Sequence, residues 1–401
     1  MNEKNVQIYN YRWIVLLLFM FANITIQMLW ISFAAVTSHA MVFYVVEETS
    51  IYLLSLVFMV VYIPVTFIAT WLIDKYDFKI GAGVGAVLAG VFGLLRFFAG
   101  TNYMLVLIFQ IGVAIGQPFL LNTMTKMSAN WFPDSERTTA TGLGMISVFI
   151  GIGLGLFVTP FIVEGISFEA MLLIYGLLAL STGLLFVVFV KNRPPTPPSL
   201  EITSEKVFVF EGLKKLFTNV NFLILFVVFF IGLGIFNTIT TYIEGICLPR
   251  NFDSTFAGIL GGLMLIGGII GALVMSTLSD KYKKRKILMI ASILMATISL
   301  FVISFAVDAI LLLVFGFLFG FGVVSASPVA LEYAVEATHP VPEASSNGML
   351  MMVGQIGGIL LILGLENMQL QPSGDYFPAL ILQTILLAIA LVLVFFLKEK
   401  K

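Results

Sequence analysis

The sequence contains little charge and almost no cysteine. Asp, Glu, Lys and Arg make up only 11% of its 401 residues, whereas 60% are hydrophobic and the mean hydropathy is +1.06. A soluble domain could not cover so much apolar surface with polar groups, so the composition predicts an integral membrane protein. The single cysteine, Cys247, excludes an internal disulfide. The two histidines, His39 and His339, fall in predicted loops on opposite faces, so we expect no metal site.

Other absences narrow the class further. A net charge of −1 gives no reason to expect a nucleic-acid partner. The phosphate-binding loop Gly-x-x-x-x-Gly-Lys-Ser/Thr is missing, so ATP is not expected to drive the protein. We therefore expect neither an enzyme nor a bound cofactor. The first apolar run is too long for a cleaved signal peptide, so the chain is expected to be mature as written.

The polar residues lie in short breaks between long apolar runs. Each run has about 20 residues, the length that a helix needs to cross a hydrocarbon core of about 30 Å. The runs are solidly apolar and do not alternate, which excludes spanning strands. The sequence therefore predicts an all-α membrane protein with twelve transmembrane helices. The expected spans are 12–38, 51–73, 79–100, 103–127, 137–164, 168–190, 221–246, 254–279, 284–306, 309–333, 343–366 and 376–397.

A polar, proline-rich stretch, KNRPPTPPSLEITSEK at 191–206, separates six spans from six. Its prolines exclude a continuous helix. The motif Leu-x-Asp-Lys-Tyr ends the second span of each half, at 72–76 and again at 278–282. We therefore expect two parallel repeats in a pseudo-twofold relation about the membrane normal. The expected parts are an N-terminal six-helix bundle at 1–190, a cytoplasmic linker at 191–220 and a C-terminal six-helix bundle at 221–401.

Basic residues fall almost entirely on one predicted face. Of the 21 Lys and Arg, only Arg96 and Arg250 lie outside the segments that this face would share. By the positive-inside rule, both termini are expected in the cytoplasm, with the chain crossing the cell membrane many times. Arg96, near the outer end of the third span, is expected to snorkel to the headgroups.

The repeated motif places an acidic residue at the cytoplasmic end of a helix. This end is the negative end of the helix dipole, so the carboxylate does not stabilise its own helix. It can instead accept hydrogen bonds from the start of a neighbouring helix, at 344–347 in one case and 137–139 in the other. We expect a latch between the halves, although loops that only set the topology are an alternative. The candidate latch residues are Asp74, Lys75, Asp280, Lys281 and Arg137.

These motifs resemble the loop signature of the major facilitator superfamily, which has the form Gly-x-x-x-Asp-Arg-x-Gly-Arg-Arg. Thr70 and Ser276 stand in place of the first glycine, and Asp77 and Lys283 in place of the second. Three stretches further resemble the feline leukaemia virus subgroup C receptor-related transporters. They are ATWLID at 69–74, NWFPDSERTTAT at 130–141 and LEYAVEATHPVPEASSNGMLMMVGQIGGIL at 331–360. This resemblance implies the major facilitator fold and a substrate such as choline or a related amine, haem export having also been claimed for the family.

Several polar side chains lie inside the predicted spans, where such residues usually face the bundle interior. In the first span Asn23, Gln27 and Trp30 share one helix face, which indicates a cavity more than an interfacial belt. Gln117 in the fourth span is equally consistent with helix packing. In the seventh span the polar run 237–244 indicates a cavity lining or a helix that bends.

Two residues of these later spans are singled out. Gln355 lies between Gly354 and Gly357, which allow a ligand to approach closely. Glu244 is the acidic residue nearest the expected pathway, so it is a candidate for coupling to protons, the alternative being a headgroup-level position without function.

The family resemblance also implies specific contacts. Trp30 and Gln355 match a tryptophan and a glutamine that contact the ligand in choline-transporting members. Phe149 and Asn237 replace a glutamine and a tyrosine of those members, which points away from choline itself and toward another amine or an aromatic solute. The candidate substrate-binding residues are Trp30, Gln355, Asn23, Gln27, Gln117, Phe149, Asn237 and Thr241.

Together these features predict a secondary active or facilitative transporter that moves a small organic solute by alternating access. The solute is expected to be a choline-like amine or an amphipathic metabolite. The expected partners are this small molecule and the lipid bilayer, with no nucleic acid, and the chain is expected to be a monomer. The alternatives are a proton-coupled multidrug or metabolite exporter and a non-transporting ligand sensor.

Overall fold

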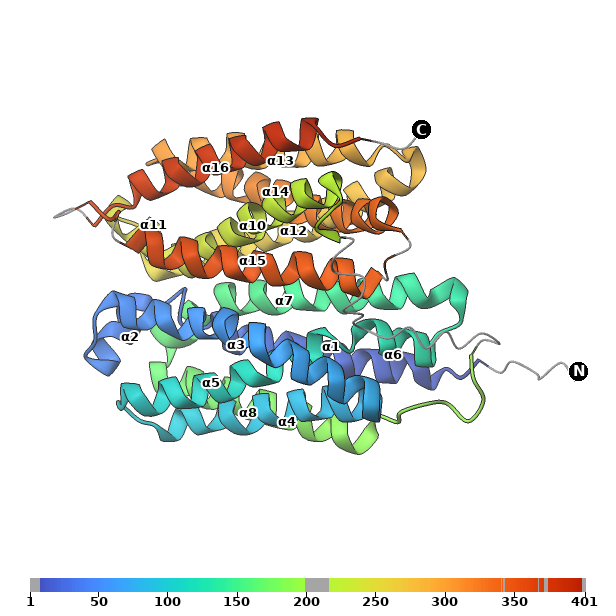
Figure 1. Ribbon diagram of the computed structural model, residues 1–401. Helices are drawn as coiled ribbons and strands as arrows, with labels where there is room; N and C mark the ends of the chain where they lie inside the picture. Colours follow the sequence, from blue (N-terminus) through green and yellow to red (C-terminus); the bar gives the residue numbers. More distant parts are fainter. Residues whose placement is uncertain are drawn as a thin grey trace, which may run out of the picture. The chain divides into compact units, whose positions relative to one another are not determined.

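The computed structural model describes residues 8–198, 216–339, 341, 343–366, 368–370 and 374–398. Most of this described chain is helical (Figure 1). Twelve of the described helices are long and apolar enough to cross a membrane. The prediction of an all-α membrane protein with twelve spans is therefore confirmed.

The helices of the first half begin and end as follows: α1 Tyr11–Ile31, α2 Thr37–Tyr44, α3 Glu48–Tyr76, α4 Phe78–Phe98, α5 Tyr103–Leu121, α6 Met124–Trp131, α7 Asp134–Gly165 and α8 Phe168–Phe189. Those of the second half are α10 Val220–Thr241, α11 Ile243–Cys247, the short 3₁₀ helix η1 Leu248–Arg250, α12 Ser254–Tyr282, α13 Arg285–Phe305, α14 Ala309–Thr338, α15 Glu343–Glu366 and α16 Phe377–Phe395.

The two halves repeat the same helix lengths. The 29-residue helix α12 begins and ends 206 positions after the 29-residue helix α3 (48 to 254 and 76 to 282). Helices α4 and α13 both have 21 residues. The N-caps repeat as well, because Asn102 accepts a hydrogen bond from Leu105 N at 3.1 Å and Asp308 accepts one from Leu311 N at 3.0 Å. The helix pattern thus follows the sequence repeat.

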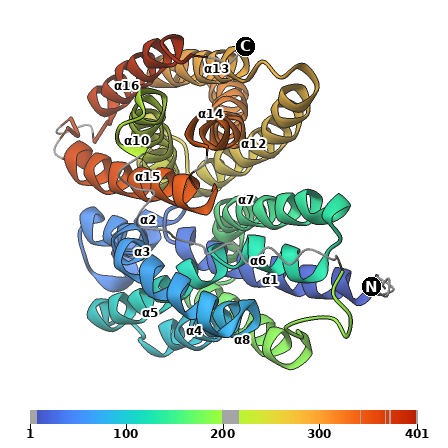
Figure 2. The ribbon, with the colours of Figure 1, turned by 45° about the vertical axis from the view of Figure 1, so that its right-hand side comes forward.

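Glycines allow the helices to approach closely within each repeat. Helix α12 lies beside α14, and α4 lies beside α8 (Figure 2). A β-carbon at Gly320 on α14 would collide with the carbonyl oxygen of Met264 on α12. A β-carbon at Gly176 on α8 would lie 2.6 Å from Leu94 Cα on α4. Contact between backbones at small residues is the usual way in which membrane helices associate, because lipid supplies little hydrophobic driving force.

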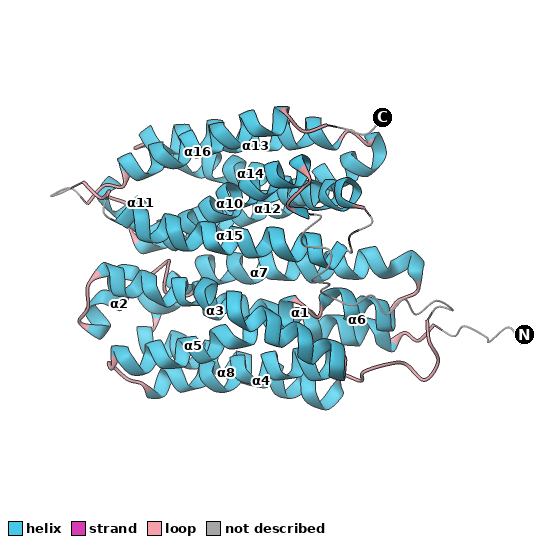
Figure 3. Ribbon diagram, viewed as in Figure 1, coloured by secondary structure: helices cyan, strands magenta, loops and turns pink. Residues whose placement is uncertain are grey.

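Three predicted spans break before their expected ends (Figure 3). The first span, expected to reach residue 38, ends at Ile31, and residues 37–44 form the separate helix α2. Ala34 N donates to Ile31 O and Val36 N to Phe33 O, so the chain turns through i to i+3 bonds after α1. The fourth span, expected at 103–127, and the seventh, expected at 221–246, end at residues 121 and 241. The residues after α1, SFAAV at 32–36, remain largely apolar, so hydropathy gives no sign of that break, whereas polar residues such as Asn122 and Lys126 follow the end of α5.

The described residues form two compact units. The first consists of residues 8–30, 61–155 and 162–198, and the second of residues 31–60, 156–161 and the described residues from 216 onward. Residues 31–60 precede the linker in sequence yet pack with the second half of the chain. The predicted linker at 191–220 is only partly described, because residues 199–215 lie outside the described ranges.

Candidate substrate site and gate residues

Trp30 lies in the last turn of α1 and is 6% exposed. The carbonyl oxygen of Leu29 accepts hydrogen bonds from Arg96 Nη1 at 3.1 Å and from Gln110 Nε2 at 3.4 Å. Arg96 Nη1 also donates to Gln110 Oε1 at 2.9 Å. The prediction that Arg96 snorkels is wrong, because its side chain is fully buried and reaches acceptors on α1 and α5. These bonds fix the end of α1 that carries Trp30.

Asn23 and Gln27 lie one turn apart on α1, and both are buried. Gln27 Oε1 accepts a hydrogen bond from Gln117 Nε2 of α5 at 3.1 Å, and Asn23 Nδ2 donates to Phe19 O at 3.2 Å. Within the described chain, Asn23 Oδ1 and Gln27 Nε2 have no hydrogen-bond partner. A buried polar group left in this state costs about 1 to 3 kcal/mol, so a water or ligand that bonds to it is stabilised there.

Helix α7 packs closely against this part of α1. A β-carbon at Gly151 would lie 2.5 Å from the carbonyl oxygen of Ile24 and 2.8 Å from Gln27 Cβ. Phe149 is half-buried two residues earlier on the same helix. The first unit therefore brings the predicted residues of α1, α5 and α7 onto neighbouring helices.

In the second unit, the predicted residues of α10 and α15 meet. Asn237 Nδ2 donates to Gln355 Oε1 at 3.3 Å, and Asn237 is only 3% exposed. A β-carbon at Gly358 would lie 3.0 Å from Asn237 Nδ2, so a small residue one turn along α15 leaves room for this pair. One turn after Asn237, Thr241 is fully buried, and its Oγ1 has no hydrogen-bond partner among the described residues. The sequence pointed to Asn237, Thr241 and Gln355 one by one, but it did not predict the contact between Asn237 and Gln355.

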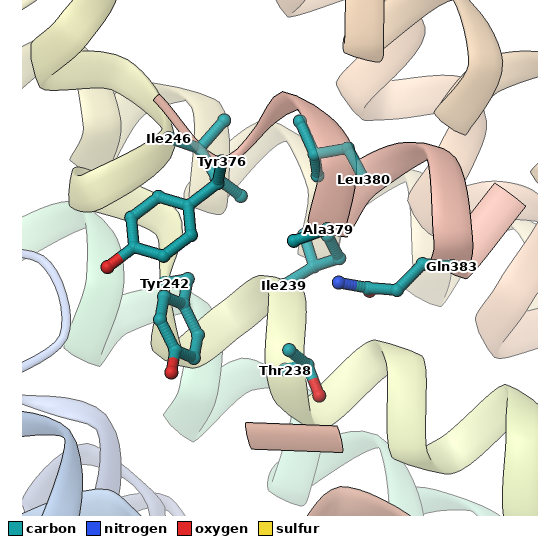
Figure 4. Close-up of a pocket in the computed structure, with 8 residues that line it drawn as sticks. All are labelled: Thr238, Ile239, Tyr242, Ile246, Tyr376, Ala379, Leu380 and Gln383. Carbon is teal, nitrogen blue, oxygen red and sulfur yellow. The ribbon is translucent and has the colours of Figure 1, made fainter. Parts of the chain in front are cut away.

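A small cavity lies on the other side of α10, against α16 (Figure 4). Its volume of about 10 Å³ is close to that needed by one water molecule. Thr238 and the rings of Tyr242 and Tyr376 line it, and the amide of Gln383 points into it. Gln383 is 2% exposed, and its Oε1 lacks a hydrogen-bond partner in the described structure. This glutamine was not predicted, although a lone amide in the apolar run of the last span is visible in the sequence.

At the end of the first unit that is close to the N-terminus, Asp74 and Lys75 occupy the last turn of α3. Asp74 Oδ1 lies 3.6 Å from Lys126 Nζ, which also donates to Ile73 O at 2.7 Å. Lys75 Nζ lies 4.9 Å from the ring centroid of Trp71. The carboxylate therefore has a basic partner within its own unit.

The remaining latch candidates lie at helix ends. Arg137 Nε, in the first turn of α7, donates to the carbonyl oxygen of Phe132 at 3.3 Å. Asp280 and Lys281 are exposed at the end of α12, where Lys281 Nζ lies 5.3 Å from the ring centroid of Tyr282. A latch between the halves stays a prediction.

Asp77 was missed as an interaction centre. Its carboxylate caps α4 by accepting a hydrogen bond from Phe78 N at 2.8 Å, and it also accepts from Asn130 Nδ2 at 2.8 Å and Arg193 Nε at 2.9 Å. Burial raises the pKa of Asp77, but these hydrogen bonds and the Arg193 charge outweigh it and hold the pKa below its usual range. An aspartate directly before a helix start is an N-cap signal, so the sequence did contain a sign of this role.

A second carboxylate is buried at the opposite end of the spans. Glu244, on α11, is fully buried and accepts hydrogen bonds from Ser38 N at 2.9 Å, Ser38 Oγ at 2.6 Å and Ser254 Oγ at 2.5 Å. Burial raises its pKa, and these bonds together with the charge of His39 act in the other direction. The two serines and His39 were not predicted, because no sequence spacing connects α2 with the start of α12.

Glu48, the first residue of α3, forms a neighbouring cluster. Its carboxylate accepts hydrogen bonds from the Tyr52 hydroxyl, from the Tyr376 hydroxyl at 3.2 Å and from Gln369 Nε2 at 3.2 Å. The ring centroids of Tyr52 and Tyr242 lie 4.0 Å apart. Residues 31–60 are thus joined to the second half of the chain by two buried or half-buried carboxylates.

Comparison with known proteins gives consistent matches. The family model of the Major Facilitator Superfamily matches residues 12–362. Solute carrier family 49 member A3 of Xenopus tropicalis is 32% identical over 88% of this chain and 77% of its own length. The choline/ethanolamine transporter flvcr2a of Danio rerio is 26% identical over 89% of this chain and 80% of its own. Among solved structures, an inward-facing bacterial homologue of the human lysosomal transporter Spinster superposes with a TM-score of 0.71 over 97% of both chains, at 13% identity.

Proposed function

The chain belongs to the major facilitator superfamily, and we propose that it moves a choline-like amine or an amphipathic metabolite across the membrane by alternating access. It is related over most of its length to choline/ethanolamine transporters, which confirms the resemblance drawn from the sequence. Both termini are proposed to lie in the cytoplasm and the chain in the cell membrane, following the distribution of basic residues.

The position of Trp30 is the observation that carries the proposed substrate class. Its side chain is buried at the end of α1, beside a carbonyl group that two donors hold in place. A cationic ammonium group is attracted to the face of a tryptophan ring, by about 2 kcal/mol or more when water is excluded. A buried tryptophan with a fixed position favours amine binding, because its side chain loses little conformational entropy when the ligand binds.

The distribution of acidic residues favours a quaternary ammonium group over a primary one. No Asp or Glu occurs in the parts of the chain that contain the proposed site residues of α1, α5, α10 and α15, namely segments 13–46, 103–133, 221–243 and 344–365. A primary ammonium loses three hydrogen bonds to water on entering such a site, whereas a quaternary ammonium donates none. In the first unit, the amide oxygen Asn23 Oδ1 has no partner among the described residues and can accept a hydrogen bond from a hydroxyl group elsewhere on the ligand.

Two replacements favour a ligand that is bulkier or more apolar than choline. Phe149 adds a half-buried aromatic ring on α7. Asn237 is shorter than a tyrosine and already donates to Gln355. Phe149 therefore adds apolar surface to α7 in the first unit, and Asn237 leaves more room beside α10 in the second.

We propose that the two ends of the pathway are controlled by separate polar contacts. On the side of the termini, the proposed latch residues are Asp74, Lys75, Asp280, Lys281 and Arg137. These contacts must break when the transporter changes from one conformation to another. They therefore change the populations of the conformations more than they change the affinity for the ligand.

A thermal-shift series on the purified chain tests the proposed substrate class. Choline, ethanolamine, a bulkier quaternary amine with a hydroxyl group and an uncharged alcohol of the same shape are each titrated. Binding to the folded state raises the melting temperature as RT ln(1 + [L]/Kd). We expect the bulky quaternary amine to give the largest shift and the uncharged analogue the smallest. Equal shifts for the charged and uncharged compounds, or none for any amine, would overturn the proposal.

A further inference from the structure

The environment of Glu244 combines full burial with contacts from distant parts of the sequence. Helix α11 follows the membrane-spanning helix α10, and the Glu244 side chain has no exposed surface. Its Oε1 accepts hydrogen bonds from the hydroxyl groups of Ser38 and Ser254, and its Oε2 accepts one from Ser38 N. Ser38 lies on α2, between the first two spans, whereas Ser254 begins α12. One carboxylate therefore joins two segments more than 200 residues apart in sequence.

The hydrogen-bond directions connect this carboxylate to a histidine. The Nδ1 atom of His39 lies 3.4 Å from both Ser38 Oγ and Ser254 Oγ. A hydroxyl group has a single proton, and each of these serines gives its proton to Glu244 Oε1. While Glu244 is ionised, the histidine is therefore the donor, with a proton on Nδ1. The imidazole, two hydroxyl groups and the carboxylate form one directed network.

Other ionisable groups surround the network. One lies on α11 itself, two in the turn that leads to α12, two on the start of α3 across Gly245, and one before α16. In that order they are Cys247 on α11, Arg250 and Asp253 before α12, Glu48 and Tyr52 on α3, and Tyr376 before α16. The tyrosines and Glu48 bond to one another, so they form a separate cluster. His39, by contrast, contacts the same two hydroxyl groups as Glu244.

We propose that Glu244, His39, Ser38 and Ser254 form a proton-binding site that controls how readily α2 separates from α11 and α12 at the membrane face opposite the termini. Separation breaks all three hydrogen bonds to Glu244 and exposes the carboxylate to water. The ligand of the site is a proton, and its occupancy depends on the pH at that face. The inference does not depend on which solute is transported.

The sign of the effect follows from proton linkage. Burial is the largest influence on Glu244 and raises its pKa, while the bonds from Ser254 and Ser38 and the charge of His39 lower it in part. In the separated arrangement the carboxylate is hydrated and its pKa returns to the ordinary range. The closed arrangement therefore binds the proton more tightly, and a fall in pH favours it. As the pH rises through the pKa of the closed arrangement, separation becomes more frequent, by at most tenfold per pH unit for one proton.

Cys247 provides a built-in probe of this separation. It is the only cysteine, lies three residues after Glu244 and is fully buried. Burial raises the pKa of its thiol to about 12, so it reacts with a maleimide only after this region opens. The charge of Glu244 also raises the pKa of Cys247, which by itself would slow labelling at higher pH. Faster labelling on ionisation of Glu244 would therefore report opening and not a direct electrostatic effect on the thiol.

The experiment compares maleimide labelling of the full-length wild type and Glu244→Gln between pH 4.5 and 8. The ratio of the two rates cancels the intrinsic pH dependence of thiol chemistry. We expect this ratio to rise by several-fold to tenfold per pH unit in the lower part of the range and to level off above it. His39→Gln should move the rise to higher pH, because a charge that favours the ionised carboxylate is lost. Glu164→Gln, at an exposed carboxylate near the end of α7, is the matched control and should follow the wild type.

A constant ratio across the pH range would overturn the proposal, as would a rise that His39→Gln leaves in place. Thermal melting in detergent establishes that each variant is folded before labelling. Should Glu244→Gln fail to fold, the wild-type rate is compared with that of Ser254→Ala, which removes one of the three hydrogen bonds to the carboxylate. Faster labelling of Ser254→Ala at every pH then supports the site, and an unchanged rate contradicts it.

Discussion

Asp77 and Lys283 occupy equivalent positions in the two repeats, and both have a positive φ angle. Asp77, between α3 and α4, has φ 73° and ψ 173°, and Lys283, between α12 and α13, has φ 57° and ψ 21°. Glycine adopts such angles without strain, whereas other residues do so at a cost of about 1 to 3 kcal/mol. The superfamily signature has a glycine at this place, so the structure explains why the signature prefers it.

The two positions are expected to respond differently to glycine. Lys283 is exposed and serves as the C-cap of α12, so Lys283→Gly should stabilise the chain by about 0.5 to 1 kcal/mol through relief of backbone strain. Asp77 keeps its unfavourable angle because its carboxylate has three hydrogen-bond donors. Asp77→Ala should therefore lower the melting temperature more than Asp77→Gly does, since alanine loses the bonds and retains the strain. Equal melting temperatures for these two variants would show that the φ angle carries no strain.

The hydrogen bonds of Asp77 also show which features of the structure could be predicted from the sequence and which could not. The repeat, the number of spans and the motif at 72–76 were all readable from residue order. Which aspartate of that motif region receives the most hydrogen bonds depends on where α3 ends, and no hydropathy change marks that residue. Asp74 was chosen because it belongs to the repeated motif, whereas Asp77 has no acidic counterpart in the second repeat.

Close packing of α12 against α14 gives a second prediction. Gly320→Ala should destabilise the chain by about 1 to 3 kcal/mol, because the new methyl group meets the backbone carbonyl of Met264 and neither helix can move without losing other contacts. Gly232→Ala on α10 is the matched control, since its β-carbon meets nothing within 4 Å. That variant should stabilise the helix by about 0.5 to 1 kcal/mol. Melting temperatures in detergent measure both, and a Gly320→Ala protein as stable as Gly232→Ala would contradict the packing argument.

The proposed latch predicts an effect on rate more than on affinity. Asp74→Asn and Asp280→Asn should each slow transport in proteoliposomes while leaving the ligand dissociation constant within a few-fold of the wild type, because the latch changes state populations and not site contacts. Asp308→Asn is the control, since asparagine also caps a helix and this residue lies at the start of α14. An unchanged turnover rate combined with a large loss of affinity would count against a latch.

The candidate site was only partly predictable for a related reason. Helix periodicity and family resemblance pointed to Trp30, Asn237 and Gln355. Periodicity, however, predicts only which residues share a face of one helix, and not which residues of different helices meet. The bonds between Asn237 and Gln355, and between Arg96 and Leu29, join different helices. Such contacts depend on helix rotation and on glycines that set the distance, neither of which a single sequence reveals.

The aromatic site itself gives the last prediction. Trp30→Ala should weaken binding of a quaternary amine by about 1 to 3 kcal/mol, whereas Trp30→Phe should retain part of the affinity, because phenylalanine keeps a smaller π-face. Trp13→Ala is a matched control on the same helix, since Trp13 is 41% exposed near the start of α1. Phe149→Gln should shift preference toward choline, because the replacement restores a hydrogen-bonding group where the related transporters carry one. Isothermal titration or thermal shift measures each change. If Trp30→Ala binds every ligand as the wild type does, an aromatic site at α1 is wrong, and the buried hydroxyl of Thr241 beside Asn237 becomes the better place to look.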